Sequence, residues 1–196
     1  TDYLPHRETW VEKLTERNSQ VETIVHNVNS KRTNVILGPK NNILYGDGTI
    51  TDHIKDLQFT LSPHSFFQVN PEQTTVLYDQ ALEYADLKGD ETVIDAYCGT
   101  GTISLFLAHK AKHVIGIEIV EPAIINAREN ARNNGYDNTE FIVADAAVEM
   151  PKLYNAGVRP DVIVFDPIRA GCKEEVLTSA ASMEPKRIVY VSCNPA

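Results

Sequence analysis

The run TVIDAYCGTGTIS, Thr92–Ser104, decides the fold of this chain. Its first part is short, apolar and rich in β-branched residues, which predicts a strand that is covered on both faces. Gly99 and Gly101 then permit a tight turn, and the stretch TISLFLAHK that follows has the length and composition of a helix. A strand, a glycine turn and a helix in this order are typical of a parallel α/β sheet.

The same alternation continues through the rest of the chain. Pro71 stands at a position typical of the first turn of a helix, and helices are also predicted for EPAIINARENARNN and CKEEVLTSAASM. The predicted strands are Thr92–Tyr97, His113–Glu118, Thr139–Asp145, Asp161–Asp166 and Arg187–Cys193. Strands that alternate with helices in this way predict an α/β fold with a doubly wound parallel sheet.

The N-terminal part of the chain predicts a separate, small α+β lobe. The spacing of apolar residues in HRETWVEKLTER predicts a short amphipathic helix. Asp47-Gly48, between NILYG and TITDHI, is a typical hairpin turn. Further strands are predicted at Val21–Asn29 and Leu57–Ser62. We therefore expect the lobe over residues 1–70 and the α/β domain over residues 71–196.

The chain is acidic, and the acidity is concentrated in the predicted α/β domain. It has 196 residues with 18 Lys and Arg against 27 Asp and Glu, a formal net charge of −9. Residues 1–70 contribute −1 of this charge and residues 71–196 contribute −8. Because nucleic-acid affinity comes largely from basic groups that neutralise phosphates, this chain alone is a poor electrostatic clamp for nucleic acid.

Composition also limits the expected location and metal chemistry. No apolar run reaches the roughly 18–20 residues of a membrane-spanning helix, and the first residues lack a signal-peptide pattern. The three cysteines form no CxxC pair and the six histidines are scattered, so we expect no disulfide framework and no metal site. A cytoplasmic monomer without a membrane partner is the simplest expectation.

Polar residues stand at the carboxyl end of every predicted strand of the α/β domain. Ligands of doubly wound sheets bind outside these ends, so the residues there form the candidate site. They are Asp95 with the glycine turn, Glu118, Asp145, Asp166 and the run Ser192-Cys193-Asn194. A sheet with a purely structural role has no need of four carboxylates in this arrangement.

The glycine turn narrows the class of ligand. Glu118 follows Gly99 by 19 residues, about the distance at which an acidic side chain reaches a ribose hydroxyl in a nucleotide-binding unit. No lysine follows the turn, which excludes a P-loop. A dinucleotide fingerprint has a third Gly or Ala where this chain has Ser104, which argues against a dinucleotide. An acidic turn suits a cationic ligand without phosphate, and S-adenosylmethionine, with its sulfonium and ammonium groups, is such a ligand. The alternative is a glycine-rich strand-to-helix turn with a structural role and no ligand.

Two further motifs carry a family resemblance. The first is FFQVN at residues 66–70, and the second is DPIRAG at residues 166–171, followed by IVYVSCNPA at residues 188–196. In this order, with DAYCGTGT between them, they resemble the RumA/TrmA family of RNA uracil-C5 methyltransferases over nearly the whole chain. The resemblance implies a Rossmann-like class I methyltransferase fold, S-adenosylmethionine as cofactor and RNA as substrate. Ribosomal RNA is favoured over transfer RNA.

The resemblance also implies roles for single residues. Cys193, the cysteine of SCNP, matches the family's catalytic nucleophile, and Phe66 matches an aromatic residue beside the target uracil. Ile168 departs from the commoner DPPR, and Thr102 stands where some members carry asparagine. Cofactor contacts are implied for Gln68, Tyr97, Thr102, Glu118, Asp145 and Asp166, to which the glycine turn adds Gly99.

The chemistry of uracil explains why such an enzyme needs a thiol. C5 of uracil is a poor nucleophile, but a thiolate that adds to C6 gives an enolate whose nucleophilic carbon is C5. Covalent catalysis therefore divides one difficult step into easier ones. Without the motif around it, Cys193 would be interpreted as a buried structural thiol. Cys98 and Cys172 lie outside the motif and keep that interpretation.

Other features of the family have no counterpart in these 196 residues. No residue matches the glutamate expected to accept the C5 proton, and neither an OB-like RNA-binding domain nor cysteine ligands for an iron–sulfur cluster are found. We therefore expect a fold truncated in its C-terminal part and a fragment that is itself inactive. Two alternatives stay open: an amino-directed methyltransferase, in which Asp166-Pro167 positions an exocyclic amine, and a catalytically incomplete cofactor-binding module.

Overall fold

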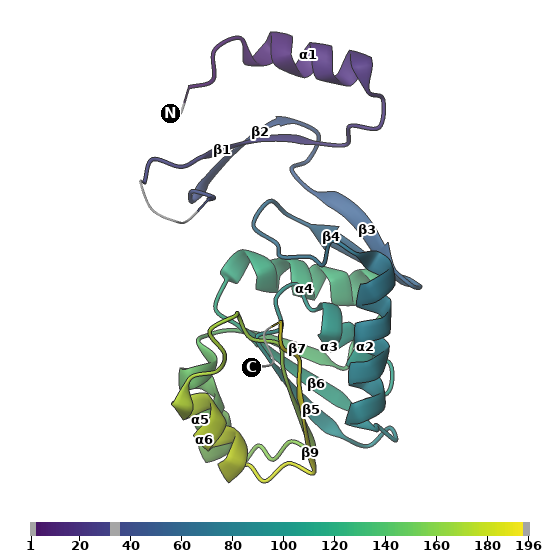
Figure 1. Ribbon diagram of the computed structural model, residues 1–196, viewed down its shortest axis with the longest axis vertical. Coiled ribbons are helices and arrows are strands. Elements are labelled where there is room, and N and C mark those ends of the chain that lie inside the picture. The colour runs from purple at the N-terminus through teal and green to yellow at the C-terminus, as the bar shows by residue number, and fades with distance from the viewer. Residues whose placement is uncertain (1–2, 32–35, 194–196) are drawn as a thin grey trace. The chain divides into compact units, whose positions relative to one another are not determined.

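The computed structural model describes residues 3–31 and 36–193 (Figure 1). The chain divides into two compact units. The first consists of Thr1–Asp52 and Thr60–His64, and the second of His53–Phe59 and Ser65–Ala196. The division into functional domains at residues 70 and 71 stays a prediction.

The first unit contains helix α1, Arg7–Arg17, and an antiparallel pair of strands, β1, Ile24–Val28, and β2, Lys40–Tyr45. The helix lies where the sequence predicts it. None of its residues is buried, however, and Trp10 and Leu14 are 59% and 45% exposed. A two-stranded ribbon offers little apolar surface to cover the face of a helix, so the amphipathic pattern is only partly used.

The hairpin predicted at Asp47-Gly48 is wrong. β2 pairs with β1, whereas β3, Ile50–Ile54, pairs with β4, Leu57–Leu61, in a second two-stranded sheet. The carboxylate of Asp47 accepts hydrogen bonds from the backbone N–H and the hydroxyl of Thr49, at 3.0 and 2.9 Å. This Asx turn bends the chain without pairing the strands on either side of it.

Five strands of the second unit form one parallel sheet in the order β7-β6-β5-β8-β9. They are β5, Thr92–Ala96, β6, His113–Glu118, β7, Thr139–Val143, β8, Val162–Phe165, and β9, Arg187–Tyr190. The first of these strands along the sequence, β5, is the central strand. β6 and β7 follow on one side of it, and β8 and β9 follow on the other side. The predicted Rossmann-like, doubly wound fold is confirmed. In folds of this kind, ligands bind outside the carboxyl ends of the strands, where the strand order reverses.

Helices cover both faces of this sheet. In Figure 1, α5 and α6 lie on one face and α2, α3 and α4 on the other. The sequence does not predict α5, because Pro151 lies inside it and reads as a helix breaker. Among the described residues, no helix has the length and apolar character that crossing a membrane requires. The helices are α2, Pro71–Ala85, α3, Thr102–Ala108, α4, Glu121–Asn133, α5, Ala146–Asn155, and α6, Glu174–Ser182.

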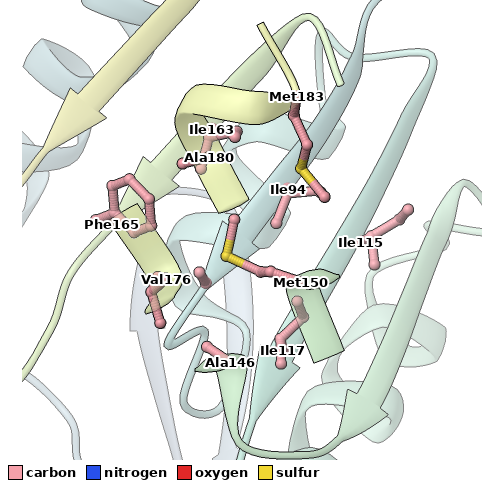
Figure 2. Close-up of a cluster of buried hydrophobic side chains, with 11 residues drawn as sticks. Ile94, Ile115, Ile117, Ala146, Met150, Ile163, Phe165, Val176, Ala180 and Met183 are labelled. Atoms are coloured by element: carbon pink, nitrogen blue, oxygen red, sulfur yellow. The ribbon is translucent and has the colours of Figure 1, made fainter. Parts of the chain in front are cut away.

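A core of buried apolar side chains fills the space between the sheet and the layer of α5 and α6 (Figure 2). Side chains of a strand alternate between its two faces, so Asp95, between two members of this core, points to the opposite layer. There it meets Ser104 of α3. The core consists of Ile94, Ala96, Ile115, Ile117, Ala146, Met150, Ile163, Phe165, Val176, Ala180 and Met183.

Candidate functional site

The glycine turn after β5 is held in an unusual backbone conformation. The N–H groups of Tyr97 and Cys98 both donate to the carbonyl of Ile117, at 2.9 and 3.0 Å. Tyr97 has a φ of 81°, in the left-handed region that favours glycine, and Gly99 and Gly101 follow with φ of 55° and 81°. A Cβ at Gly99 would meet no atom within 4 Å, so the turn leaves room for a ligand against its backbone.

A carboxyl group is buried beneath this turn. Asp95 has no exposed surface, and its Oδ2 accepts a hydrogen bond from the Ser104 hydroxyl at 2.5 Å. Burial, together with the charges of Asp166 and Glu118, raises the pKa of Asp95 to about 7. Its Oδ1 and the buried hydroxyl of Thr100 have no hydrogen-bond partner within the described chain. A cation bound beside the turn would therefore stabilise the ionised carboxylate.

The carboxylates of Glu118 and Asp145 are oriented by nearby backbone. Glu118 ends β6, and its Oε1 accepts from the N–H of Val120 at 2.9 Å while its Oε2 accepts from the N–H of Gly99 at 3.3 Å. Asp145 follows β7 and caps α5 by accepting from the N–H of Ala147 at 2.9 Å. Because β6 and β7 are parallel neighbours, these two carboxylates lie along one edge of the sheet.

Asp145 also has a cationic partner that the sequence does not reveal. Its Oδ2 accepts a hydrogen bond from Nζ of Lys173 at 2.5 Å. This ion pair holds the pKa of Asp145 below its ordinary value and the pKa of Lys173 above its own. The two residues are 28 positions apart, and no motif marks them as neighbours. Only the fold brings the residue before α6 onto the end of β7.

The ends of β8 and β9 form the other half of this edge. The two strands pair in parallel, with Phe165 opposite Tyr190, and the N–H of Val191 donates to the carbonyl of Phe165 at 2.8 Å. Asp166 directly follows β8, and burial raises its pKa to about 6. Cys193 lies shortly after the end of β9. The structure therefore places Asp166 and Cys193 on adjacent strand ends.

The three cysteines differ in accessibility. Cys98 is buried, and burial raises the pKa of its thiol well above the ordinary value. Cys172 is half-buried, and burial also raises its pKa. Cys193 is exposed. Within the described part of the chain, no three His, Cys, Asp or Glu side chains gather in a way that could hold a metal ion.

The FFQVN segment lies in the stretch before α2 rather than at a strand end. The ring of Phe67 packs against Phe59, with centroids 5.8 Å apart, whereas Phe66 is 74% exposed. Gln68 is half-buried. Asn70 caps α2, because its side-chain oxygen accepts a hydrogen bond from the backbone N–H of Gln73 at 3.1 Å. Of the two aromatic residues, Phe66 is the more exposed.

Thr102 begins α3, and its hydroxyl is already partly engaged. It shares a hydrogen bond with the hydroxyl of Tyr78 at 3.1 Å. Tyr78 is buried, and burial raises its pKa to about 12, so it is neutral at ordinary pH. The bond limits the rotation of Thr102 and leaves part of its hydrogen-bonding capacity for a ligand.

The hydrogen-bond acceptors and negative charges at this edge fit S-adenosylmethionine. Carboxylates accept hydrogen bonds from ribose hydroxyls and from an exocyclic amine. Among the residues that the structure describes, none supplies a positive charge that lowers the pKa of buried Asp95, and a sulfonium or ammonium would provide one. Six predicted contact residues come together at the ends of β5, β6, β7 and β8, and their individual roles stay predictions. They are Tyr97, Gly99, Thr102, Glu118, Asp145 and Asp166.

The fold defines a Rossmann-like α/β domain, and the acidic groups at the carboxyl ends of its strands are its candidate ligand site. A family model described as a methyltransferase domain matches residues 87–196, more than half of the chain. The chain therefore belongs to the methyltransferase domain family.

The relatives of this chain are longer proteins. It is 58% identical over 193 residues to a protein of Halalkalibacterium halodurans and 54% identical over 193 residues to one of Clostridium tetani, both named as uncharacterized RNA methyltransferases. Each alignment covers 98% of this chain but 42% of the relative, so the chain spans less than half the length of these relatives.

A solved structure is also similar over most of the chain. It is the tRNA (uracil-54, C5)-methyltransferase of Pyrococcus abyssi in complex with S-adenosyl-L-homocysteine. The two superpose with a TM-score of 0.74 at 30% sequence identity, over 92% of this chain and 43% of that one.

Proposed function

We propose that this chain is the cofactor-binding and thiol-bearing part of an RNA uracil-C5 methyltransferase. It is a methyltransferase domain, and S-adenosylmethionine is its cofactor. RNA methylation is supported by the names of its relatives, and C5 of uracil by the name of the Pyrococcus abyssi protein. To these the proposal adds the reacting thiol.

The observation that carries the proposal is the position of Cys193. It is the exposed cysteine of the three, and it follows β9, whose neighbour β8 ends at Asp166. A nucleophile for C6 of uracil must reach a substrate that enters from solvent, beside the site that holds the cofactor. Cys98 is buried, which makes it a poor candidate for this role.

The proposed roles follow from the order of the strands. Glu118, close to the glycine turn, accepts hydrogen bonds from the ribose hydroxyls, and Asp145, one strand further out, accepts one from the exocyclic amine of adenine. Asp166, with Gln68, Tyr97 and Thr102, lies toward the methionine end, where the acidic groups offset cationic charge. Phe66, with its exposed ring, stacks on the target base.

The reaction then divides between the thiol and a base. Sγ of Cys193, as the thiolate, forms a bond to C6 of uracil, and the C5–C6 π electrons move onto the C4 carbonyl to give an enolate. S-adenosylmethionine supplies the methyl group that C5 receives. A base afterwards removes the C5 proton, the electrons of that C–H bond restore the C5–C6 double bond, and the thiolate leaves. The base is proposed to lie in the part of the protein outside these 196 residues.

An amino-directed methyltransferase is the second candidate. In that reaction Asp166-Pro167 would hold an exocyclic amine, and no thiol would be required. Ile168 and Arg169 follow the proline, where amino-directed enzymes usually place an aromatic residue, and this favours the uracil reaction. The exposed thiol of Cys193, which follows the strand next to the one that Asp166 follows, also favours the uracil reaction.

The nature of the methylated nucleoside tests the proposal. The full-length protein is incubated with S-adenosylmethionine and with ribosomal or transfer RNA, and the RNA is digested to nucleosides and analysed by mass spectrometry. We expect 5-methyluridine, with ribosomal RNA as the better substrate. Methyl groups found only on exocyclic amines would replace the proposal by the second candidate, and a preference for transfer RNA would change the RNA class alone.

A further inference from the structure

An ion pair lies where the proposed adenine end of the cofactor binds. Nζ of Lys173 is 2.5 Å from Oδ2 of Asp145, and their side chains are 61% and 28% exposed. Oδ1 of the same carboxylate accepts from the N–H of Ala147 at 2.9 Å. One oxygen is therefore used by the helix cap and the other by the lysine.

The lysine ends a short connection that crosses the edge of the sheet. Residues 166–173 link β8 to α6, with Asp166 at one end and Lys173 at the other. Cys172 lies beside Tyr97, whose pKa is raised to about 12 by burial and by this thiol. The connection thus contacts the ends of both β5 and β7, on either side of the proposed ribose contact.

We propose that Lys173 is a specificity-determining residue of the cofactor site, because its ammonium competes with the ligand's exocyclic amine for the Asp145 carboxylate. This inference rests on the proposed role of Asp145. An adenine amine that donates to Oδ2 takes the place of the ammonium, which is exposed enough to turn into solvent. A purine with a 6-oxo group has no amine to donate, and its oxygen accepts a hydrogen bond from the lysine instead. Lys173 therefore narrows the difference in affinity between 6-amino and 6-oxo purine ligands.

The size of the effect follows from the exposure of the pair. Exposed ion pairs are weak, and the loss of one corresponds to a change in a binding constant of at most about five-fold. Removal of the ammonium should therefore tighten the binding of an adenine ligand by up to about five-fold.

Calorimetric titration of the 196-residue chain with two ligands tests the inference. The ligands are S-adenosylhomocysteine and S-inosylhomocysteine, which differ at the 6-position of the purine. Lys173→Met keeps the length of the side chain and removes its charge. We expect this variant to bind S-adenosylhomocysteine about 1.4- to five-fold more tightly than the wild type and to bind the inosine compound no more tightly. Circular dichroism and thermal unfolding verify that the variant is folded.

Matched variants separate this inference from the proposed function. Lys152→Met removes a lysine whose ion pair with Glu149, at 2.9 Å on α5, lies outside the site, and it should bind both ligands as the wild type does. Asp145→Ser keeps a helix-capping oxygen but removes the carboxylate, and it should weaken the binding of S-adenosylhomocysteine.

The possible failures are distinct. Unchanged or weaker binding of S-adenosylhomocysteine by Lys173→Met, with weaker binding by Asp145→Ser, would overturn the competition and keep the cofactor placement. Wild-type binding by Asp145→Ser would instead remove Asp145 from the adenine site, and the inference would fall with it.

Discussion

The two halves of the sheet's carboxyl edge are built differently. At β6 and β7, the carboxylates of Glu118 and Asp145 are engaged by backbone N–H groups, and Asp145 is also paired with Lys173. At β8 and β9, Asp166 has a raised pKa and Cys193 is exposed. The first half is organised before a ligand arrives, whereas the second half holds groups whose charge and reactivity depend on what binds beside them.

The largest effect is expected in the organised half, from Glu118→Ala. The variant loses the contact with the N–H of Gly99 and, with it, the proposed charge-assisted hydrogen bond to the ribose. We expect S-adenosylmethionine to bind about 1–3 kcal/mol more weakly, which calorimetry measures directly. Glu140→Ala removes an exposed carboxylate that faces His113, at 3.7 Å, and serves as the control. Equal affinities for the two variants would remove the end of β6 from the site.

The next effect concerns the packing that supports the organised half. A Cβ at Gly116 in β6 would lie 2.6 Å from the ring of Phe141 and 2.9 Å from Sγ of Cys98, in the glycine turn. Overpacking of this kind costs about 1–3 kcal/mol, so Gly116→Ala should lower the free energy of unfolding in urea by that amount. Addition of Phe141→Leu should restore part of the loss. An unchanged unfolding curve would mean that the sheet is less tightly packed beneath the turn.

The pH dependence of stability should distinguish the two halves by sign. The pKa of Asp145 is lower in the folded protein than its ordinary value of 3.8. Its ionised carboxylate therefore stabilises the fold above pH 3.8, and this stabilisation is lost as the pH falls through the pKa of the folded state. The pKa of Asp166 is raised to about 6 in the folded protein. Its contribution to folding stability is therefore fully present below pH 3.8, where the group is protonated in both states, and is lost as the pH rises toward 6.

Urea unfolding at a series of pH values from about 4.5 to about 7.5 measures how the free energy of unfolding changes with pH for each variant. Relative to the wild type, Asp166→Asn should gain stability as the pH rises to about 6 and then level off. Asp145→Asn keeps the helix cap and should show a constant loss of about 0.2–1 kcal/mol across this range. Parallel profiles for the two variants would contradict the distinction between the halves.

Local pattern predicts the regular part of this fold and fails where partners are distant. The β-branched runs and glycine turns predict all five strands of the parallel sheet, within a few residues at their ends. The turn at Asp47-Gly48 is also local, but the partners of β2 and β3 depend on the rest of the chain. Pro151 conceals α5, which forms because Asp145 caps it and Met150 is fully buried in the core.

The candidate site shows the same limit. The rule that ligands bind at strand ends identifies Glu118, Asp145 and Asp166 from the sequence, because position along the chain is sufficient there. The contact of Lys173 with Asp145 and that of Tyr78 with Thr102 require two elements to meet in space. The role of Cys193 depends on a motif resemblance, since a single thiol in an apolar run carries no functional signal of its own.

The most direct test of the central claim is a covalent adduct at Cys193. The full-length protein is incubated with S-adenosylmethionine and RNA that contains 5-fluorouracil, and the products are weighed by mass spectrometry. Fluorine at C5 cannot leave as a proton does, so the methylated RNA should stay attached to the wild type and to Cys98→Ala and Cys172→Ala. Cys193→Ala should form no adduct while it binds S-adenosylhomocysteine as the wild type does. An adduct that persists in Cys193→Ala, or normal turnover by that variant, would contradict covalent catalysis by this thiol.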